Sequence, residues 1–301
     1  MDPFHHVRDG STWELPKFVH EMLGRDSHFV LPFGLTKYMV LQVVAAALVY
    51  FIFRGLSKRI ASGKPAHGIW WNFWEMLALF VRDEVVRPSI GIPHHHDDHG
   101  HADHSHGHDE HHHTEASATH AAAEVEVGHP ADKYLPYVWS VFFYILFCNL
   151  LGAIPFLGSP TADINVTGVL AAVTFFHVVF FGSEQAGFVS FLKSLVPHME
   201  LPAAIAIVLL PGIWVIEAGG LLIKHGVLAI RLFANIMAGH TVLGVFLAFI
   251  ATAGSYWSIV MPASILAQVG IGMLELFVAF LQAYVFALLT SLFISSVVNP
   301  H

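Results

Sequence analysis

Long apolar runs separated by shorter polar segments form the main pattern along this chain. Three runs, Thr36 to Phe53, Tyr134 to Phe156 and Val166 to Phe181, lie close to the roughly 20 residues that an α-helix needs to cross a bilayer. Two later runs, Pro211 to Ile250 and Pro262 to Val298, are about twice as long. As straight helices they would measure about 60 and 55 Å, nearly twice the hydrocarbon thickness of a membrane.

These lengths leave two arrangements for the last two runs. Either each run breaks in two, or both lie steeply tilted as an antiparallel hairpin. Tilt in an ordinary bundle rarely exceeds about 40°, so a hairpin that wraps around a curved partner explains the lengths better. The pattern predicts an all-α integral membrane protein with about five membrane-embedded helices, the last two long and steeply tilted, plus one interfacial amphipathic helix.

The interfacial helix is expected between Gly68 and Pro88, where charged residues interrupt an apolar stretch. Trp70, Trp74, Leu77 and Val81 recur there at helical spacing. A tryptophan-rich amphipathic helix is typical of the membrane interface. We therefore predict a helix lying in the cytoplasmic interface, with a poorly hydrophobic true span as the alternative.

Changes in polarity divide the chain into four parts. They are an N-terminal extramembrane segment with a short surface helix (1–35), the first span and the interfacial helix (36–90), a His-rich disordered cytoplasmic loop (91–132) and a membrane-embedded domain (133–301). We expect the functional residues in the last part, because its apolar runs contain the buried charges.

Basic residues set the expected orientation. Arg54, Lys58, Arg59 and Lys64 follow the first run directly. The positive-inside rule places that end in the cytoplasm. The N-terminus is then outside and, by the number of crossings, the C-terminus is cytoplasmic.

The loop between residues 94 and 129 is packed with histidine and aspartate. Alternating imidazole and carboxylate groups are ligands for zinc, nickel or copper. We favour a disordered, solvated linker, because the histidine spacing is irregular. A metal bound here would take its ligands from the two histidine triplets, His94, His95, His96, His111, His112 and His113.

Composition supports a membrane protein and excludes several classes. The mean hydropathy is +0.62 and only 12% of residues are charged. A net charge of -8 gives no reason to expect nucleic acid as a partner. Cys148 is the only cysteine, so we expect neither an intrachain disulfide nor a cysteine-based metal site, and no cofactor is predicted. The first ten residues lack a basic region followed by an apolar core, so no cleaved signal peptide is expected.

Arg231 lies near the middle of the run from Pro211 to Ile250. An arginine at the centre of a membrane helix costs roughly 3 kcal/mol on insertion scales, and more in simulations. A snorkelling arginine would lie near a helix end, so we expect Arg231 to face water or a protein partner. Its guanidinium is a permanent charge, because it does not lose its proton under accessible conditions.

Other polar residues share a helix face with Arg231. Glu217, Lys224 and Arg231 are spaced by seven, and seven-residue steps return to nearly the same face. Asn235 stays within about 40° of that face. His240 falls on the opposite side, roughly 13 Å along the axis.

The final run has its own polar stripe, Gln268, Glu275 and Gln282, again spaced by seven. If the two runs are antiparallel with a turn near 254–261, counting places Glu275 level with His240. Gln282 then comes level with the region of Arg231. The outer end would pair a histidine with a carboxylate, and mid-membrane would pair an amide with the arginine.

Two further polar residues lie near the ends of the shorter runs. Asn149 lies towards the far end of the second run, and Asp163 immediately precedes the third. An aspartate at this point caps a helix start. Capping and a role at a channel mouth are both open for Asp163, and we include Asn149 as a candidate at the same mouth.

The segment IRLFANIMAGH resembles a motif of the membrane-embedded a subunit of F-type ATP synthases. LELFVAFLQAYVFALLT resembles the final helix of that subunit, and PTADINVT resembles the loop before its middle helix. The resemblance covers roughly residues 36–90 and 133–298. It implies a proton-translocating stator in a bacterial plasma membrane, with c-ring subunits, peripheral-stalk b subunits and membrane lipid as partners. Such a chain takes part in ATP synthesis but is not an enzyme on its own.

The resemblance also implies roles, position by position. Arg231 resembles the essential stator arginine, with Asn235 and Gln282 as its polar neighbours. Glu217 resembles the acidic group on the cytoplasmic side. His240 and Glu275 resemble the coupled pair of the outer half-channel, with the two residue types exchanged relative to many bacterial members.

Two other functional classes are alternatives to the stator. A divalent-metal transporter would explain the His-rich loop, but it needs several ligands converging inside the membrane. A membrane-embedded enzyme would need a nucleophile with its base, or an HExxH motif, and the chain has neither. The stator remains the favoured function, with the metal transporter as the alternative.

Overall fold

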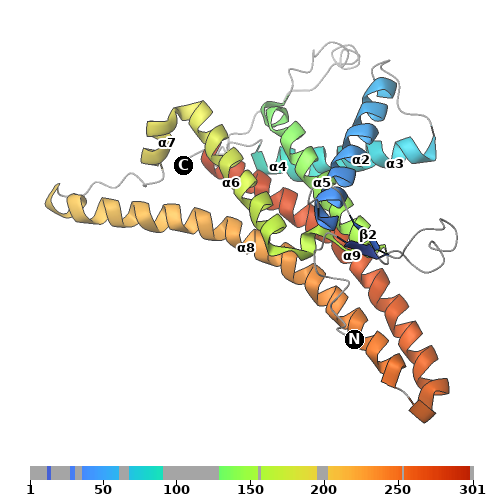
Figure 1. Ribbon diagram of the computed structural model, residues 1–301. Helices are drawn as coiled ribbons and strands as arrows, with labels where there is room; N and C mark the ends of the chain where they lie inside the picture. The colour runs from blue at the N-terminus through green and yellow to red at the C-terminus, as the bar shows by residue number, and fades with distance from the viewer. Residues whose placement is uncertain are drawn as a thin grey trace, which may run out of the picture.

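The structure is a computed structural model that describes residues 36–60, 68–90, 129–154, 157–194, 203–252 and 254–298, together with the backbone of 12–14 and 28–30. The membrane part of these ranges is helical throughout, as predicted (Figure 1). Near the N-terminus, β1 (Thr12–Glu14) pairs antiparallel with β2 (His28–Val30), an element that the sequence pattern did not indicate. The surface helix expected within residues 1–35 falls outside the described residues.

Five helices are long and apolar enough to cross a membrane. They are α2 (Lys37–Ile60), α5 (Leu135–Ala153), α6 (Ile164–Ala186), α8 (Ala203–Thr252) and α9 (Trp257–Val298). The predicted number of spans is therefore confirmed. Several of their ends differ from the predicted runs: α2, α6, α8 and α9 extend into flanking residues, whereas α5 ends at Ala153, before the predicted Phe156.

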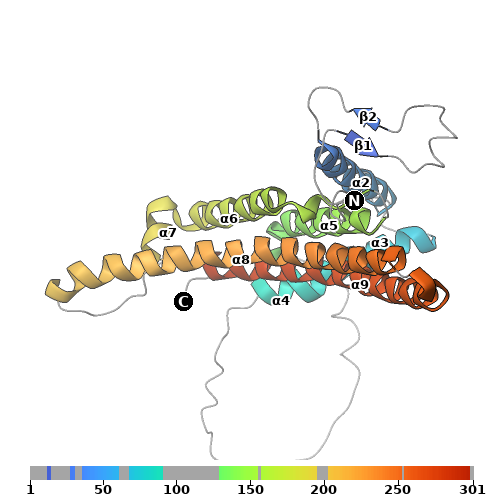
Figure 2. The same ribbon diagram turned by 60° about the horizontal axis from the view of Figure 1, so that its bottom comes forward.

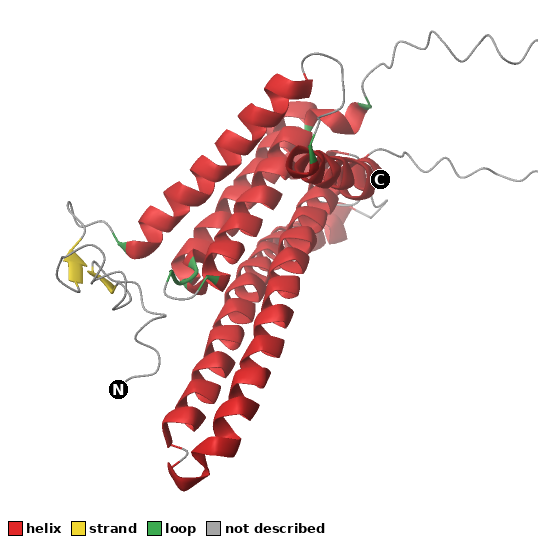
Figure 3. Cartoon of the chain, turned by 90° about the vertical axis from the view of Figure 1, so that its right-hand side faces the viewer, coloured by secondary structure: helices red, strands yellow, loops and turns green. Residues whose placement is uncertain are grey.

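The last two helices form an antiparallel hairpin, which Figure 3 shows from the side. α8 has 50 residues and α9 has 42, and neither breaks in two. The short η6 helix (Gly254–Tyr256) makes the turn, so α9 begins earlier than the sequence run suggested and contains Pro262. The hairpin alternative is confirmed.

The helices form layers, seen best in Figure 2. α5 packs on α9, α6 packs on both α8 and α9, and α2 packs on α5. The N-terminal part of α8 projects beyond the other spans (Figure 1). The hairpin is thus covered on one side by α5 and α6.

The hydrophobic core centres on α5, which is apolar on all sides, as expected of a buried helix. Phe142, Phe143 and Ile145 are fully buried there. The ring of Phe143 lies 4.9 Å from that of Phe53 on α2 and 6.0 Å from that of Trp74. These aromatic contacts fix the interfacial helix and the first span to the bundle.

A helical run lies crosswise to α2 and α5 (Figure 1). It consists of α3 (Ile69–Phe80), the π-helical η3 (Val81–Val86) and α4 (Arg87–Ile90). It is not among the five candidate spans, in agreement with an interfacial helix. Of the residues at helical spacing, Trp74, Leu77 and Val81 are buried, whereas Trp70 is 62% exposed in the first turn of α3.

Short elements complete the described chain. They are η4 (Pro130–Lys133), η5 (Pro160–Ala162) and α7 (Phe188–Ser194). Nε and Nη2 of Arg87 donate to the carboxylate of Asp132 at 3.2 and 3.1 Å, which ties α4 to η4. The segment before α5 is therefore anchored to the interfacial run.

Candidate functional site

Three charged residues lie on the exposed face of α8. Glu217, Lys224 and Arg231 are all exposed, as expected for residues that share one face. Their neighbours Val227 and Ile230 are apolar and exposed too. Only 6% of the most apolar stretch of α8 is buried, against 67% for α5. A permanent charge thus stands on an apolar surface that the described part of the chain leaves open.

Residues on the opposite side of α8 face the rest of the protein. Leu232 and Ile236 are buried there, whereas Asn235, which lies within about 40° of the Arg231 face, is half-buried. Gln282 on α9 is also buried. Counting antiparallel from the contact of Gly239 with Glu275 puts Gln282 level with Leu232, next to Arg231 in the sequence. Because Gln282 is buried and Arg231 is exposed, the pairing of this amide with the arginine stays a prediction.

Glu275 on α9 lies against α8 one residue before His240. A Cβ added at Gly239 would lie 3.0 Å from Oε1 of Glu275, so this carboxylate packs against the residue next to His240. Nε2 of His240 is buried and has no hydrogen-bond partner among the described residues. Helical counting therefore placed Glu275 within one residue of the level of His240. The pairing of the two side chains stays a prediction.

Asn149 takes part in a buried hydrogen-bond network. Its Oδ1 accepts a hydrogen bond from the Thr161 hydroxyl at 2.8 Å, and its Nδ2 donates to the carbonyl of Ala279 at 3.3 Å. The hydroxyls of Ser159 and Thr161 lie 2.7 Å apart. Asn149 thus joins α5, η5 and α9, and its assignment to a channel mouth stays a prediction.

Asp163 is the N-cap of α6. Its Oδ1 accepts a hydrogen bond from the backbone N–H of Asn165 at 2.8 Å. The capping alternative is therefore confirmed. A role at a channel mouth stays a prediction, and a half-exposed carboxylate does not contradict it.

Two buried basic residues were not among the predicted site residues. Lys37 is buried at the start of α2, beside Gly158. His225 is only 2% exposed, between the rings of Phe175 at 5.4 Å and Phe293 at 4.6 Å. The sequence could have drawn attention to Lys37, because it is a cation at the outer end of the first apolar run. The positive-inside rule expects cations at the cytoplasmic end.

Metal ligation has no support within the described residues. They contain no group of three or more histidine, cysteine, aspartate or glutamate side chains that could hold a metal ion. The histidine triplets at 94–96 and 111–113 lie outside the described residues. The metal alternative for that loop stays a prediction.

Comparison with known proteins identifies the family. The profile of the family described as ATP synthase A chain matches residues 117–295. The chain belongs to the ATP synthase subunit a family. It is similar to ATP synthase subunit a of Anaeromyxobacter sp. (strain Fw109-5), with 32% identity over 332 aligned positions that cover 99% of this chain and 70% of the relative.

Two further relatives agree. ATP synthase subunit a 2 of Chlorobaculum tepidum is 32% identical over 293 positions, covering 96% of this chain and 70% of the relative. ATP synthase subunit a of Pelagibacter ubique is 41% identical over 176 positions, covering 58% of this chain and 68% of the relative. The higher identity over the shorter stretch is in keeping with the family profile, which matches only residues 117–295.

Membership in this family decides the function class. The chain is a multi-pass membrane protein and a proton-translocating subunit of the membrane sector of ATP synthase. It works in an assembly with other subunits of the synthase and is not an enzyme on its own. The alternative of a divalent-metal transporter is not supported.

Proposed function

We propose that this chain provides two offset half-channels for protons, with Arg231 as a charge barrier between them. The observation that carries the proposal is the position of Arg231, exposed in the middle of the largely uncovered α8. A ring of c subunits, each with a carboxylate in the membrane, would pass along this face. The fixed guanidinium favours the ionised form of a passing carboxylate and opposes a direct leak of protons.

The outer half-channel is assigned to His240 and Glu275. The Glu275 carboxylate lies against Gly239, the residue that precedes His240. Imidazole and carboxylate are groups that accept and release protons within reach of physiological pH. Protons from outside would pass this pair and neutralise a ring carboxylate. A neutral carboxyl group then turns through lipid at low electrostatic cost.

The cytoplasmic half-channel is assigned to the side of Glu217. Glu217 is exposed on the same face of α8 as Arg231, two seven-residue steps towards the N-terminal end of the helix. A ring carboxylate that has passed through lipid would release its proton there. Each elementary charge that crosses 100 mV supplies about 2.3 kcal/mol to the rotation.

Asn235 and Gln282 are proposed as polar neighbours that orient Arg231. The remaining partners are peripheral-stalk b subunits and membrane lipid. The basic end of α2 supports an orientation with the N-terminus outside and the C-terminus in the cytoplasm of a bacterial cell. The membrane is then the bacterial plasma membrane.

The test is passive proton uptake into vesicles that contain the assembled membrane sector. Arg231→Ala should allow an uncoupled leak and abolish proton-driven ATP synthesis, because the charge barrier is lost. His240→Gln and Glu275→Gln should slow uptake several-fold. His177→Gln and Glu84→Gln are matched controls for the histidine and glutamate changes, and we expect them to leave uptake unchanged.

Retained ATP synthesis in Arg231→Ala would disprove the barrier. Unchanged uptake in both His240→Gln and Glu275→Gln would disprove the outer path without affecting the arginine assignment. The two outcomes are distinguishable, because the first is measured in Arg231→Ala and the second in His240→Gln and Glu275→Gln.

A further inference from the structure

Two polar residues of α9, Ser264 and Gln268, lie between the η6 turn and Glu275. Neither belongs to the proton path assigned above, and most side chains in this half of α9 are apolar. A polar group at membrane depth is costly unless a neighbouring helix or water satisfies it. Ser264 and Gln268 are therefore candidates for a section of the outer path that precedes Glu275.

The burial pattern of α9 shows that both residues face α8. Ser264, Gln268 and Glu275 are buried or half-buried, whereas Leu266 and Met273 between them are 74% and 72% exposed. Burial at this spacing marks one stripe along a helix, with the exposed apolar side chains suited to lipid. Glu275 lies on this stripe and packs against Gly239 of α8, and the two helices run side by side (Figure 3). We call the line where they meet the α8–α9 seam.

Two nitrogen atoms in the α8–α9 seam are buried and have no hydrogen-bond partner among the described residues. They are Nε2 of His240 on α8 and Nε2 of Gln268 on α9. If the Gln268 amide is turned over, its oxygen takes the buried position, so the need for a partner remains. Burying such a group without a partner is costly, and inside proteins water commonly supplies the missing hydrogen bonds. The two atoms therefore indicate a hydrated seam.

The spacing of the polar residues suits water rather than direct contact. Counting antiparallel from the contact of Gly239 with Glu275 puts Gln268 level with Phe246, about 10 Å along the helix from Glu275. Ser264, which is only 5% exposed, lies about 6 Å further towards η6. Hydrogen-bonded oxygens lie about 2.8 Å apart, so a few waters in a row span the distance from Gln268 to Glu275.

The α8–α9 seam leads outwards from His240 to the η6 turn. In the orientation proposed above, α8 runs from the cytoplasmic side to the outer side, so η6 lies outside. The turn end of the hairpin projects beyond the shorter spans α5 and α6 (Figure 1). Waters in the seam would therefore connect the outer solution with His240 and Glu275.

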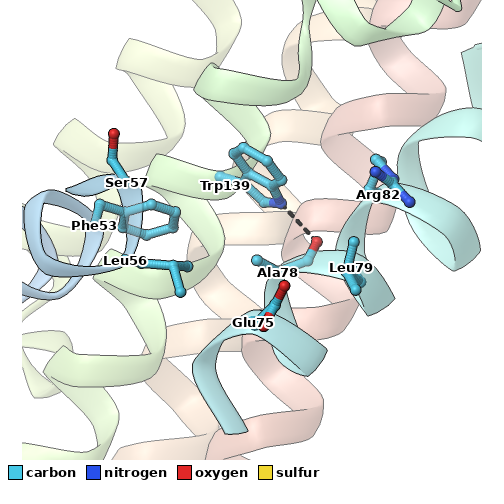
Figure 4. A pocket seen from close by; sticks show the side chains of 8 residues that line it. All are labelled: Phe53, Leu56, Ser57, Glu75, Ala78, Leu79, Arg82 and Trp139. Atoms are coloured by element: carbon cyan, nitrogen blue, oxygen red, sulfur yellow. Dashed lines mark hydrogen bonds between the residues drawn. The ribbon is translucent and has the colours of Figure 1, made fainter. Parts of the chain in front are cut away.

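A cleft elsewhere in the bundle offers no such route. It has a volume of about 570 Å³, and the described residues that line it belong to α2, α3, η3 and α5 (Figure 4). Its charged lining residues are Glu75 and Arg82, and the Arg82 guanidinium donates to the carboxylate of Asp83 at 2.8 and 3.1 Å. Because no described residue of α8 or α9 lines this cleft, it does not lead to Glu275.

We propose that Gln268 positions a file of waters through which protons from outside reach His240 and Glu275. Its carboxamide both donates and accepts hydrogen bonds, so it orients waters without binding the proton itself. A proton that enters the file at its outer end releases another at its inner end, which binds the imidazole or the carboxylate. Ser264 lies at the outer end of the same path. The inference rests on the proposed outer half-channel, because His240 and Glu275 are the acceptors.

Passive proton uptake into vesicles that contain the assembled membrane sector tests the role of Gln268. Gln268→Leu keeps a side chain of similar size but removes both polar atoms, and it should slow uptake several-fold. Gln268→Asn keeps an amide and should retain most of the wild-type rate. Gln42→Leu is the matched control, because Gln42 is a half-buried glutamine of α2, outside the seam. It should leave uptake unchanged.

A second measurement detects water in the seam directly. The chain's only cysteine, Cys148, is buried, so Gln268→Cys and Leu266→Cys each add one new thiol. A charged methanethiosulfonate reagent that does not cross the membrane is added to the outer side, and mass spectrometry of the chain measures its modification. Gln268→Cys should react, because its thiol is in contact with water. Leu266→Cys should not react, since this position faces lipid.

The outcomes separate this inference from the proposed half-channel. Normal uptake in Gln268→Leu, or a Gln268→Cys thiol that does not react from outside, would overturn the water file. Equal slowing by Gln268→Leu and Gln42→Leu would overturn it too. In each case, slow uptake in His240→Gln and Glu275→Gln would still support the outer half-channel, whereas normal uptake in those two variants would overturn the half-channel itself.

Discussion

The carboxylate of Glu275 lies directly against the backbone of Gly239. A Cβ at Gly239 would stand 3.0 Å from Oε1 and 3.1 Å from Cδ of Glu275. Small residues allow membrane helices to approach this closely, because no side chain separates the backbones. The approach sets the level of α8 against α9 and places the carboxylate beside Gly239, one residue before His240.

Enlarging Gly239 should therefore slow proton uptake. Alanine brings one methyl group against the flexible end of Glu275, which moves by a few tenths of an ångström, so we expect a small effect. Valine adds two further methyl groups and should displace the carboxylate, with a several-fold loss of uptake in vesicles. Gly168→Val on α6 is the control for valine in a helix, since a Cβ there meets nothing within 4 Å. Equal effects of the valine changes at the two positions would contradict the role of the Gly239 contact.

Breaking the Asn149 network should destabilise the protein. Asn149→Leu removes the acceptor of the Thr161 hydroxyl and the donor to the Ala279 carbonyl, both of them in a buried site. Leaving buried polar groups unsatisfied costs about 1–3 kcal/mol each. The midpoint of thermal unfolding in detergent should fall accordingly. When Thr161→Val is made in the Asn149→Leu variant, it should lower the unfolding midpoint by less than it does in the wild type, because the two residues share one hydrogen bond.

Asp163 offers a test that separates capping from proton conduction. Asp163→Asn keeps a capping oxygen and removes the charge, whereas Asp163→Ala removes both. Loss of an N-cap costs about 1 kcal/mol, so we expect the alanine variant alone to unfold at lower temperature. Proton uptake should be unchanged in the asparagine variant if the residue only caps α6. Slower uptake with normal stability would instead assign Asp163 to the channel mouth.

The contact between Arg87 and Asp132 should make stability depend on pH. Hydrogen bonds from Arg87 hold the pKa of the Asp132 carboxyl below its usual value of 3.8. Because the folded-state pKa is depressed, this stabilisation is present above the unfolded pKa and is lost as the pH falls through the folded value. Thermal unfolding of the wild type and of Asp132→Asn should therefore differ at neutral pH. The difference should shrink as the pH falls below about 4, and a difference that stays constant down to the lowest pH would contradict this origin.

The sequence alone predicted the spans and the levels of their polar residues. Hydrophobic length indicated five membrane helices, and the antiparallel count placed Glu275 within one residue of the level of His240, because helix rise and periodicity depend only on residue number. The same periodicity put Arg231 and His240 on opposite sides of α8. Periodicity does not show where a helix extends beyond its neighbours, so it left open that Trp74 is buried and Trp70 is 62% exposed.

Only the tertiary structure decided which groups meet across elements distant in the chain. Lys37 beside Gly158, Asn149 joined to Thr161 and Ala279, and the cleft containing Glu75 and Arg82 all depend on how α2, α3, α5 and α9 pack. Local sequence determines helix formation and facing, because both follow from nearest-neighbour geometry and burial of apolar surface. Contacts between helices depend on close packing of many side chains at once, and no single run of residues contains that information.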